Sequence, residues 1–567
     1  MCGIIGITNK TEAAAAGITF GLKALEYRGY DSAGSIFTQN FEIYKTIQSL
    51  EVLDKMIKHQ AGTTALGHTR WATHGKICIE NTHPIKIGDA AIAHNGILEN
   101  HIEIRNQINY TPQTGTDTEI LLALMLHINR LQFGSDRSNE GILKTLSETK
   151  KAAHGSFSAA FVFAQSDTIY WIRNGIVPLI AAEYDGGNAI ASDECALNKN
   201  AIIFELNNDA YGYISPNKIE ILSETETKQH AINISDTYTK EASKSWLEIE
   251  IEQQSEIYER ESKKEPIDLK LGQYDSVLLI GCGSAYIAAT IGKLWLEEEG
   301  IKANAEIASE WHCRKSAESK NTLVILISQS GETADTLLAL EKAQKMGLST
   351  LAIVNKENST IAKQADRKIL LEIGTEQSVA STKAFTSQLA KLFSIAKKAP
   401  ISNRLHDLAY QATKMDISNI SSTLSNAQAI MIIGKNAMYS IALEGALKLK
   451  ELTYMNVDAY ASSELKHGYI ALVDENTYAI GLAPSNNNYQ TVLSNISEIK
   501  TRHGKILLLA EKNDIEAEMF LQMPKMDEHE AAFTYIIIIQ RLALEIAHKK
   551  HLPIDRPRNL AKSITVI

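Results

Sequence analysis

Cys2 is the first residue of the chain that could act as a nucleophile. A methionine ahead of a small side chain is removed during maturation, which would leave Cys2 with both a thiol and a free α-amine. An adjacent amine can take the proton of a thiol and so activate it for attack on a carbonyl carbon. The β-branched run that follows, GIIGI, predicts a buried strand beginning next to the cysteine. The alternative is an inert, buried cysteine near the start of the chain.

Three short motifs contain the other groups that amide cleavage would need. HTRWATHG contains Arg70, which suits a carboxylate, and GTDTE contains Asp117, which suits an ammonium group. HNG follows a predicted strand, so the Asn95 side chain and the Gly96 N–H could form an oxyanion hole. Taken one at a time, each has a simpler explanation: Arg70 as a solvated surface charge, Asp117 as a helix N-cap and HNG as a turn. Together with Cys2 they predict an amide-cleaving site.

LVILISQSGETADT, residues 323–336, has the pattern of a phosphate-binding loop. A buried strand ends in hydroxyl groups and a glycine, and a helix begins near Thr333. Backbone N–H groups and a helix N-terminus attract phosphate. The motif lacks the GxxxxGK[ST] pattern of a P-loop, and a serine-rich helix cap is the alternative. GCGSAY and SVASTKAFT also follow predicted strands, and ligands of open α/β sheets bind at the carboxyl ends of strands.

ALEGALKLKELTY, residues 442–454, is a predicted helix that places Lys448 and Glu451 on one face, since they are three residues apart. An ordinary ion pair explains this spacing. A carboxylate base with a neighbouring cation could also move a proton between adjacent carbons of a sugar.

The elements that must position these groups differ between the two halves of the chain. The first 225 or so residues predict an α+β fold, with strands near 4–7, 90–93, 158–163 and 189–192 and a helix over 118–131. Glu, Lys, Ser and Thr dominate residues 223–264, which predicts a linker that becomes a charged helix from about Trp246. From Asp275 onward, strand–turn–helix units predict parallel sheets covered by helices.

The second half also repeats itself. Residues 336–358 and 492–514 both read as a helix, a glycine stop, a strand and a polar turn, with Gly347 and Gly504 at the matching helix ends. The repeat predicts two tandem α/β subdomains.

Composition narrows the class of protein. The net charge is −10, with a mean hydropathy of −0.14 and no dense basic patch, which argues against a nucleic-acid partner. The five cysteines form no CxxC pair, which favours a reducing compartment and no structural metal site. No apolar run reaches membrane-span length and no signal peptide is evident, so we expect a cytoplasmic protein without membrane association.

The first half resembles the glutaminase domain of the N-terminal-nucleophile amidotransferases. EYRGYDSAG and TRWATHG narrow this to the glucosamine-6-phosphate synthase family, the isomerizing glutamine–fructose-6-phosphate aminotransferases. The resemblance implies an αββα sandwich and attack of the Cys2 thiolate on the glutamine carboxamide. It further implies that Asn95 and Gly96 hold the oxyanion, that Trp71 gates the release of ammonia, and that glutamine is bound by Arg70, His74 and Asp117.

The second half is similar to the sugar isomerase (SIS) domain in doubled form. The resemblance implies that Glu451 shuttles a proton between C1 and C2, assisted by Lys448. His467, supplied by a partner subunit, would open the sugar ring, and Lys562 in the tail would form a Schiff base with the ketose. The implied contacts to the phosphate are Ser328, Gln329, Ser330 and Thr333, and those to the sugar are Ser284, Val379 and Ser381.

The implied enzyme converts fructose 6-phosphate and L-glutamine to glucosamine 6-phosphate, channels ammonia between its two sites, uses no cofactor or metal, and forms a homodimer. The expected domains are a glutaminase domain at 2–228, a linker at 229–264, SIS subdomains at 265–410 and 411–555, and a tail at 556–567.

Departures from the family pattern keep alternatives open. CGSAY replaces the usual CGTSY, so Ala285 stands where a sugar-facing serine is expected, and the chain ends in Ile567 where glutamate is customary. The stretch SWLEIEIEQQ only loosely follows the usual KEIxEQP. A paralogue that acts on another ketose phosphate would fit these departures. A phosphoribosyl amidotransferase would need a pyrophosphate-binding strand that the sequence lacks, and a sugar-phosphate sensor would not need Glu451, His467 and Lys562.

Overall fold

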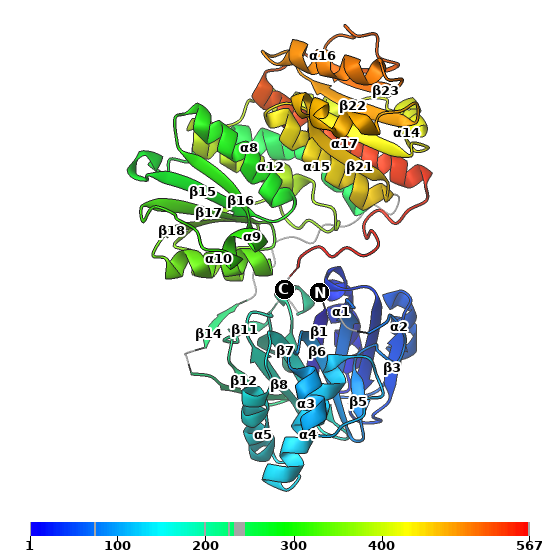
Figure 1. Cartoon of the computed structure of the whole chain (residues 1–567). Coiled ribbons are helices and arrows are strands. Elements are labelled where there is room, and N and C mark those ends of the chain that lie inside the picture. Colours follow the sequence, from blue (N-terminus) through cyan, green and yellow to red (C-terminus); the bar gives the residue numbers. More distant parts are fainter. Residues whose placement is uncertain (1, 73–74, 198–199, 225–226, 232–243, 565–567) are drawn as a thin grey trace. The chain divides into compact units, whose positions relative to one another are not determined.

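The computed structural model describes residues 2–72, 75–197, 200–224, 227–231 and 244–564. The chain forms two compact units, Met1–Thr237 with Ser563–Ile567, and Tyr238–Lys562 (Figure 1). Each unit contains two sheets, which are antiparallel in the first unit and parallel in the second.

The first unit is an αββα sandwich, as expected. Its larger sheet has the order β14-β11-β9-β10-β1-β4-β2-β3 and its smaller sheet the order β13-β12-β8-β7-β6-β5. The strands of the larger sheet are β1 (Gly3–Asn9), β2 (Ser32–Phe37), β3 (Ile43–Thr46), β4 (Thr64–Arg70), β9 (Ile180–Tyr184), β10 (Gly187–Ala191), β11 (Ile202–Glu205) and β14 (Lys228–Ala231). Those of the smaller sheet are β5 (Ile85–Ile87), β6 (Ala90–Gly96), β7 (Phe157–Phe163), β8 (Ile169–Asn174), β12 (Tyr211–Ser215) and β13 (Lys218–Leu222).

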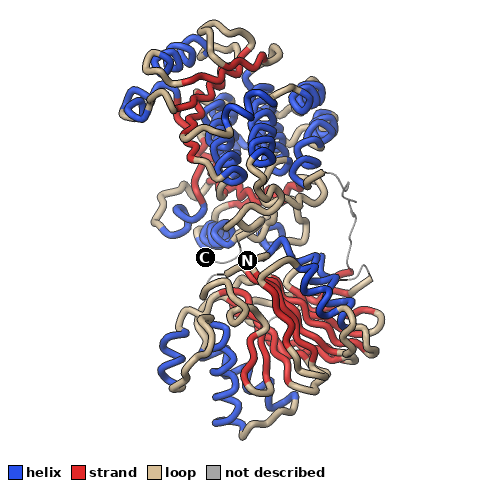
Figure 2. Tube along the Cα trace, turned by 90° about the vertical axis from the view of Figure 1, so that its right-hand side faces the viewer, coloured by secondary structure: helices blue, strands red, loops and turns tan. Residues whose placement is uncertain are grey.

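The side chains of β1 point alternately to the two faces of its sheet, and this shows how the layers form. Ile4 packs in the core between the two sheets, whereas Ile5 and Ile7 pack in the core beneath helices α1 (Ala14–Leu25) and α2 (Leu50–Ile57). A third core joins the smaller sheet to its helices. Side chains two apart in a strand share a face, so an apolar run such as GIIGI is buried on both faces. Helices therefore lie on both sides of the paired sheets (Figure 2). The helices of the smaller sheet are α3 (His101–Gln107), α4 (Asp117–Phe133) and α5 (Asn139–Ala152).

The second unit contains the predicted tandem repeat. Its sheets have the orders β16-β15-β17-β18-β19 and β21-β20-β22-β23-β24, which are the same when counted within each sheet. The strands are β15 (Ser276–Gly281), β16 (Ala303–Ile307), β17 (Thr322–Ser328), β18 (Ser349–Val354) and β19 (Arg367–Leu370), then β20 (Ala429–Gly434), β21 (Asn456–Ala461), β22 (Thr477–Ala483), β23 (Lys505–Ala510) and β24 (Met519–Gln522). The helices of the two subdomains are α8 (Ser284–Glu298), α9 (Ala308–Cys313), α10 (Ala334–Lys345), α11 (Thr360–Gln364), α12 (Lys383–Lys397), α13 (Leu405–Lys414), α14 (Ser418–Leu424), α15 (Ala437–Thr453), α16 (Tyr489–Lys500) and α17 (Glu528–Lys549).

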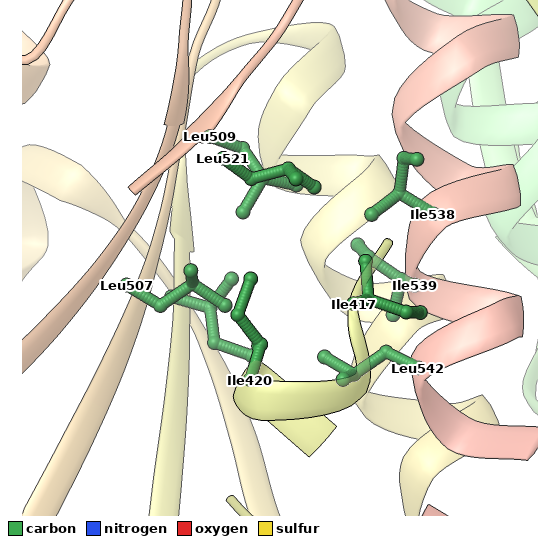
Figure 3. Close-up of a pocket in the computed structure, with 9 residues that line it drawn as sticks. Ile417, Ile420, Leu507, Leu509, Leu521, Ile538, Ile539 and Leu542 are labelled. Carbon is green, nitrogen blue, oxygen red and sulfur yellow. The ribbon is translucent and has the colours of Figure 1, made fainter. Parts of the chain in front are cut away.

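Helix α17 is the central helix of the second subdomain. It is the one helix among the described residues that is long and apolar enough to cross a membrane, and 83% of its apolar window is buried within the protein. It packs closely on α15 and α13. A small cavity between α14, α17 and the sheet is lined only by Ile and Leu side chains, so it is a gap in the core without chemical groups (Figure 3).

The expected linker at 229–264 is divided between the two units. Residues 229–231 belong to β14 of the first unit, whereas residues 244–264 belong to the second unit and are largely helical. The sequence predicts one charged helix here, whereas the structure has two, α6 (Trp246–Glu252) and α7 (Gln254–Ser262). Leu247 and Tyr258 are fully buried, and the Tyr258 hydroxyl donates to the Phe533 carbonyl at 3.1 Å. Glu256, Glu259 and Arg260 are exposed, whereas Glu250 and Glu261 are buried together with the apolar residues that join the core.

Candidate active sites

The Cys2 thiol lies where β1 and β4 begin their pairing in register Gly3–Thr69. Its Sγ accepts a hydrogen bond from the Trp71 N–H at 3.2 Å and lies 3.3 Å from the Trp71 carbonyl oxygen. Burial raises the pKa of the Cys2 thiol, and the charges of Arg70 and Arg28 oppose that rise. A thiol in this environment needs a base before it can act as a nucleophile.

Asn95 and Gly96 end β6 beside the cysteine. The Asn95 amide donates to the Cys2 carbonyl oxygen at 3.1 Å and to the Ser192 hydroxyl at 2.8 Å. An oxyanion bound by this amide would have to replace one of these two acceptors. Gly96 has φ +108°, and a Cβ there would lie 2.3 Å from the Ser156 carbonyl oxygen, so this strand end requires glycine.

A small pocket is lined by most of the residues predicted for glutamine binding. Asp117 is the first residue of α4, and its side chain accepts a hydrogen bond from the Leu98 N–H at 2.9 Å. The N-cap of the helix is Thr116, not Asp117. Arg70 donates to the backbone carbonyls of Gly75 and Lys76, both at 3.3 Å. His74 lies outside the described residues. The pocket is lined by Cys2, Arg70, Trp71, His83, His94, Gly96, Thr116, Asp117 and Thr118.

A group of buried histidines under this pocket was not predicted. His68 Nε2 lies 3.0 Å from Asn95 Oδ1 and 3.2 Å from His83 Nδ1. Burial lowers the pKa of His68 to about 3 and that of His83 well below its usual range, so both are neutral. Among the described residues, no set of His, Cys, Asp and Glu side chains is arranged to hold a metal ion. His68 is thus a neutral partner of the Asn95 side chain, and His83 contacts His68 in turn.

The predicted phosphate loop connects β17 to α10. The Ser328 hydroxyl accepts a hydrogen bond from the Gly331 N–H at 3.0 Å and lies 2.9 Å from Thr333 Oγ1, while Ser330 Oγ accepts from the Glu332 N–H at 3.2 Å. Gly331 has φ +65°, and a Cβ there would lie 1.9 Å from Ser359 Oγ. The loop, which also contains Gln329, thus turns sharply so that its hydroxyls and N–H groups gather at the start of α10.

Lys448 and Glu451 form part of a larger charged group on α15. Lys448 Nζ lies 2.7 Å from Glu451 Oε2, 3.4 Å from Glu444 Oε1 and 3.3 Å from Ser284 Oγ. Ser284 donates to Glu444 Oε1 at 2.8 Å, so α8 of the first subdomain contacts α15 of the second. Burial raises the pKa of Glu444 to about 7, and the two carboxylates raise the pKa of Lys448 although its own burial opposes them. Glu444 was missed in the sequence, although it lies in the same motif four residues before Lys448.

Lys562 lies in the same network of charges. Its ammonium group donates to Glu376 Oε2, and Glu376 also raises the pKa of Lys448. The Val379 N–H donates to the carbonyl oxygen of Asp555, the residue before the tail, at 3.0 Å, which joins the start of the tail to the loop that contains Ser381. Val379 and Ser381 are half-buried. Glu376, two residues before SVAST, was not predicted.

His467 lies outside the charged group formed by Lys448, Glu451 and their neighbours. It is exposed at the end of the short helix η4 (Ser462–His467). Within the described chain, no hydrogen bond or ion pair connects it to Lys448 or Glu451.

Comparison with known proteins defines the class of protein. Residues 46–183 match the model of the class-II glutamine amidotransferases, and residues 270–396 and 423–548 each match the SIS domain. The chain is therefore an amidotransferase joined to a pair of SIS domains.

The relatives define the family. The isomerizing glutamine–fructose-6-phosphate aminotransferases of Methanosarcina acetivorans and Bradyrhizobium diazoefficiens are each 34% identical to this chain over 619 aligned residues, with both proteins covered completely. The C-terminal domain of the glucosamine–fructose-6-phosphate aminotransferase from Francisella tularensis covers 56% of this chain and 100% of its own, with 30% identity and a TM-score of 0.53. The chain belongs to the family of isomerizing glutamine–fructose-6-phosphate aminotransferases, and it is an enzyme.

Proposed function

We propose that this enzyme uses L-glutamine and fructose 6-phosphate to make glutamate and glucosamine 6-phosphate. The observation that carries the proposal is the buried group in which Lys448 Nζ contacts both Glu451 Oε2, at 2.7 Å, and Ser284 Oγ, at 3.3 Å. A carboxylate base beside a cation suits proton transfer on a sugar. The phosphate loop at the end of β17 belongs to the same sheet as the strand that precedes Ser284.

The glutaminase reaction is assigned to residues 2–228. The α-amine of Cys2, once free, takes the thiol proton, and the thiolate forms a bond to the carboxamide carbon of glutamine. Asn95 and Gly96 stabilise the oxyanion, Arg70, His74 and Asp117 bind the amino-acid end, and Trp71 gates the exit of ammonia. Breakage of the C–N bond releases ammonia, and water then hydrolyses the thioester to glutamate.

The sugar reaction is assigned to the subdomains at 265–410 and 411–555 and the tail at 556–567. Ser328, Gln329, Ser330 and Thr333 bind the phosphate, and Ser284, Val379 and Ser381 contact the sugar. Lys562 forms the Schiff base with the C2 carbonyl, from which water leaves. Glu451, with Lys448 beside it, moves the proton between C1 and C2. Ammonia that has passed from the Cys2 site attacks C2 of this Schiff base and displaces Lys562 as a free amine, before Glu451 transfers the proton.

Ala285 is the residue on which the alternative of a paralogue with another ketose phosphate depends, and it has no hydroxyl to offer a ligand. It is 9% exposed and belongs to the same core cluster as Ala288 and Ile287. CGSAY differs from CGTSY at two positions, and Ser284, the first of them, keeps a hydroxyl.

We propose a homodimer in which each subunit supplies His467 to its partner. The exposure of this residue in the single chain supports the proposal. Mixing two inactive variants, Glu451→Gln and His467→Gln, should restore part of the sugar activity, because hybrid dimers contain one intact site. No recovery after subunit exchange would contradict the shared site.

The function is tested by incubating the full chain with glutamine and fructose 6-phosphate and measuring glutamate and glucosamine 6-phosphate. Cys2→Ala should abolish both products by orders of magnitude, because no covalent route remains. Glu451→Gln should abolish the amino sugar and leave glutamate release. Loss of both activities in a folded Glu451→Gln protein would contradict two separate sites.

A further inference from the structure

Glu444 is a buried carboxylate that the proposed reaction does not use. It lies on α15 at positions i, i+4 and i+7 with Lys448 and Glu451, so the three side chains share one face of the helix. The Glu444 side chain is 0% exposed and that of Lys448 is 1% exposed, whereas Glu451 is 19% exposed. Glu444 therefore lies behind Lys448, on the side away from solvent, and Glu451 lies in front of it.

The two oxygens of Glu444 have different surroundings. Oε1 accepts a hydrogen bond from Ser284 and faces Lys448 Nζ at 3.4 Å. Oε2 is buried and has no hydrogen-bond partner among the described residues. A buried charge without full hydrogen bonding is costly, so a carboxyl in this position binds a proton more readily than one in water. Burial accordingly raises the pKa of Glu444 to about 7.

We propose that Glu444 is a positioning residue that controls how strongly Lys448 interacts with Glu451, and thereby the strength of Glu451 as a base. When Glu444 is ionised, Lys448 shares its charge between two carboxylates, and Glu451 keeps a greater affinity for protons. When Glu444 is protonated, the full charge of Lys448 acts on Glu451 and weakens it as a base. The proposal rests on the assignment of Glu451 as the base of the sugar reaction.

The charged groups around Glu444 are few. Lys448 and Glu451 face it from its own helix, and Ser284 faces it from α8 with a neutral hydroxyl. Glu376, which precedes α12, acts on Lys448 and is itself paired with Lys562. Glu250 of α6 is a second buried carboxyl in this network: it acts on Glu376 and Lys562, and burial raises its pKa to about 8. Glu444 is the carboxyl in contact with Lys448 whose pKa burial raises to about 7.

The test is the release of tritium from C1 of fructose 6-phosphate into water, measured with the full-length enzyme from pH 5.5 to 9. This reaction reports the proton transfer without the glutamine site. Glu444→Gln keeps a hydrogen-bond acceptor for Ser284 but removes the charge. We expect kcat for tritium release to fall by 10-fold or more, KM to change less than 2-fold, and the decline of wild-type activity below about pH 7 to be lost.

Glu444→Asp and Lys450→Gln complete the experiment. Glu444→Asp keeps a titrating carboxyl and should retain the acidic decline with an intermediate kcat, even if Glu444→Gln folds poorly. Lys450 is exposed on the same helix and pairs with Asp458, so Lys450→Gln should match the wild type. Glutaminase activity and the thermal transition report folding.

The outcomes separate this inference from the proposed function. A wild-type kcat and pH profile in folded Glu444→Gln would overturn the inference alone. A change in KM with no change in kcat or pH profile would also overturn it, because Glu444 would then serve substrate binding. Absence of tritium from both the water and C2 of the product in the wild-type reaction would overturn the proposed function, and the inference with it.

Discussion

The ammonium group of Lys562 donates a hydrogen bond to Glu376 Oε2, and the two side chains are only 6% and 0% exposed. Glu376 is held in turn by the N–H groups of Thr382 and Ala384 at the start of α12, at 3.1 and 2.9 Å. Two backbone donors and the ammonium group together lower the pKa of Glu376 although its burial raises it. The tail lysine is thus anchored to the loop before α12 by a buried charge pair.

Glu376→Gln should release the tail. A buried ammonium group without its counter-ion is strongly unfavourable, so Lys562 should move into solvent. We expect trypsin to cleave after Lys562 at least 10-fold faster than in the wild type, as measured by mass spectrometry, and the sugar reaction to fall while glutaminase activity persists. Glu357→Gln is the matched control, because its pair with Lys368 is 63% and 38% exposed and contributes little. Equal cleavage of the tail in wild type and Glu376→Gln would contradict the anchoring role.

Gly331→Ala should disable the phosphate loop. Its φ of +65° disfavours a side chain, and the added Cβ would lie 1.9 Å from Ser359 Oγ, so the loop must move. We expect KM for fructose 6-phosphate to rise by 10-fold or more without change in glutamine hydrolysis. Gly347→Ala tests backbone strain alone, because Gly347 has φ +74° but no atom within 4 Å of the new Cβ. It should cost about 1–2 kcal/mol of stability and leave KM unchanged.

The first unit should lose stability in acid because His68 and His83 are buried in the neutral form. Their pKa values are lowered, that of His68 to about 3, so the unfolded state binds more protons below about pH 6.5. The free energy of unfolding should then fall as the pH drops from 6.5 toward 3, by up to ~1.4 kcal/mol per pH unit for each histidine. Hydrogen exchange of β4 and β6 measures this loss. His83→Gln should show a shallower dependence on pH, and an unchanged slope would contradict the assignment.

The sequence predicts the local motifs correctly because the structure of each motif depends mainly on residues that are close together in the chain. The loop 328–333 was predicted from a buried strand, a glycine and a following helix, and the structure has these elements. The strand at the start of the chain was also predicted, since β-branched residues continue through β1. The functional assignments of the individual residues stay predictions until they are tested.

The sequence alone does not point to Glu444, Glu376 or His68, because their surroundings are formed by segments that lie far apart in the chain. Glu444 gains its importance from Ser284, 160 residues earlier, and Glu376 from Lys562, 186 residues later. Buried His68 could not be recognised from HTRWATHG, because its partner Asn95 belongs to another sheet. Helices α6 and α7 have the composition of a linker, and only their packing on α13 and α17 shows that they belong to the core.

The central claim is that nitrogen released from glutamine at Cys2 becomes the amino group of the sugar without leaving the enzyme. It is tested most directly with glutamine labelled with ¹⁵N in the amide, supplied with fructose 6-phosphate and an excess of unlabelled ammonium. Mass spectrometry of the glucosamine 6-phosphate should show nearly complete ¹⁵N at C2, equal in amount to the glutamate formed, and no labelled product from Cys2→Ala. Product in which the label is diluted to the isotope ratio of the ammonium in solution would contradict transfer between the two sites.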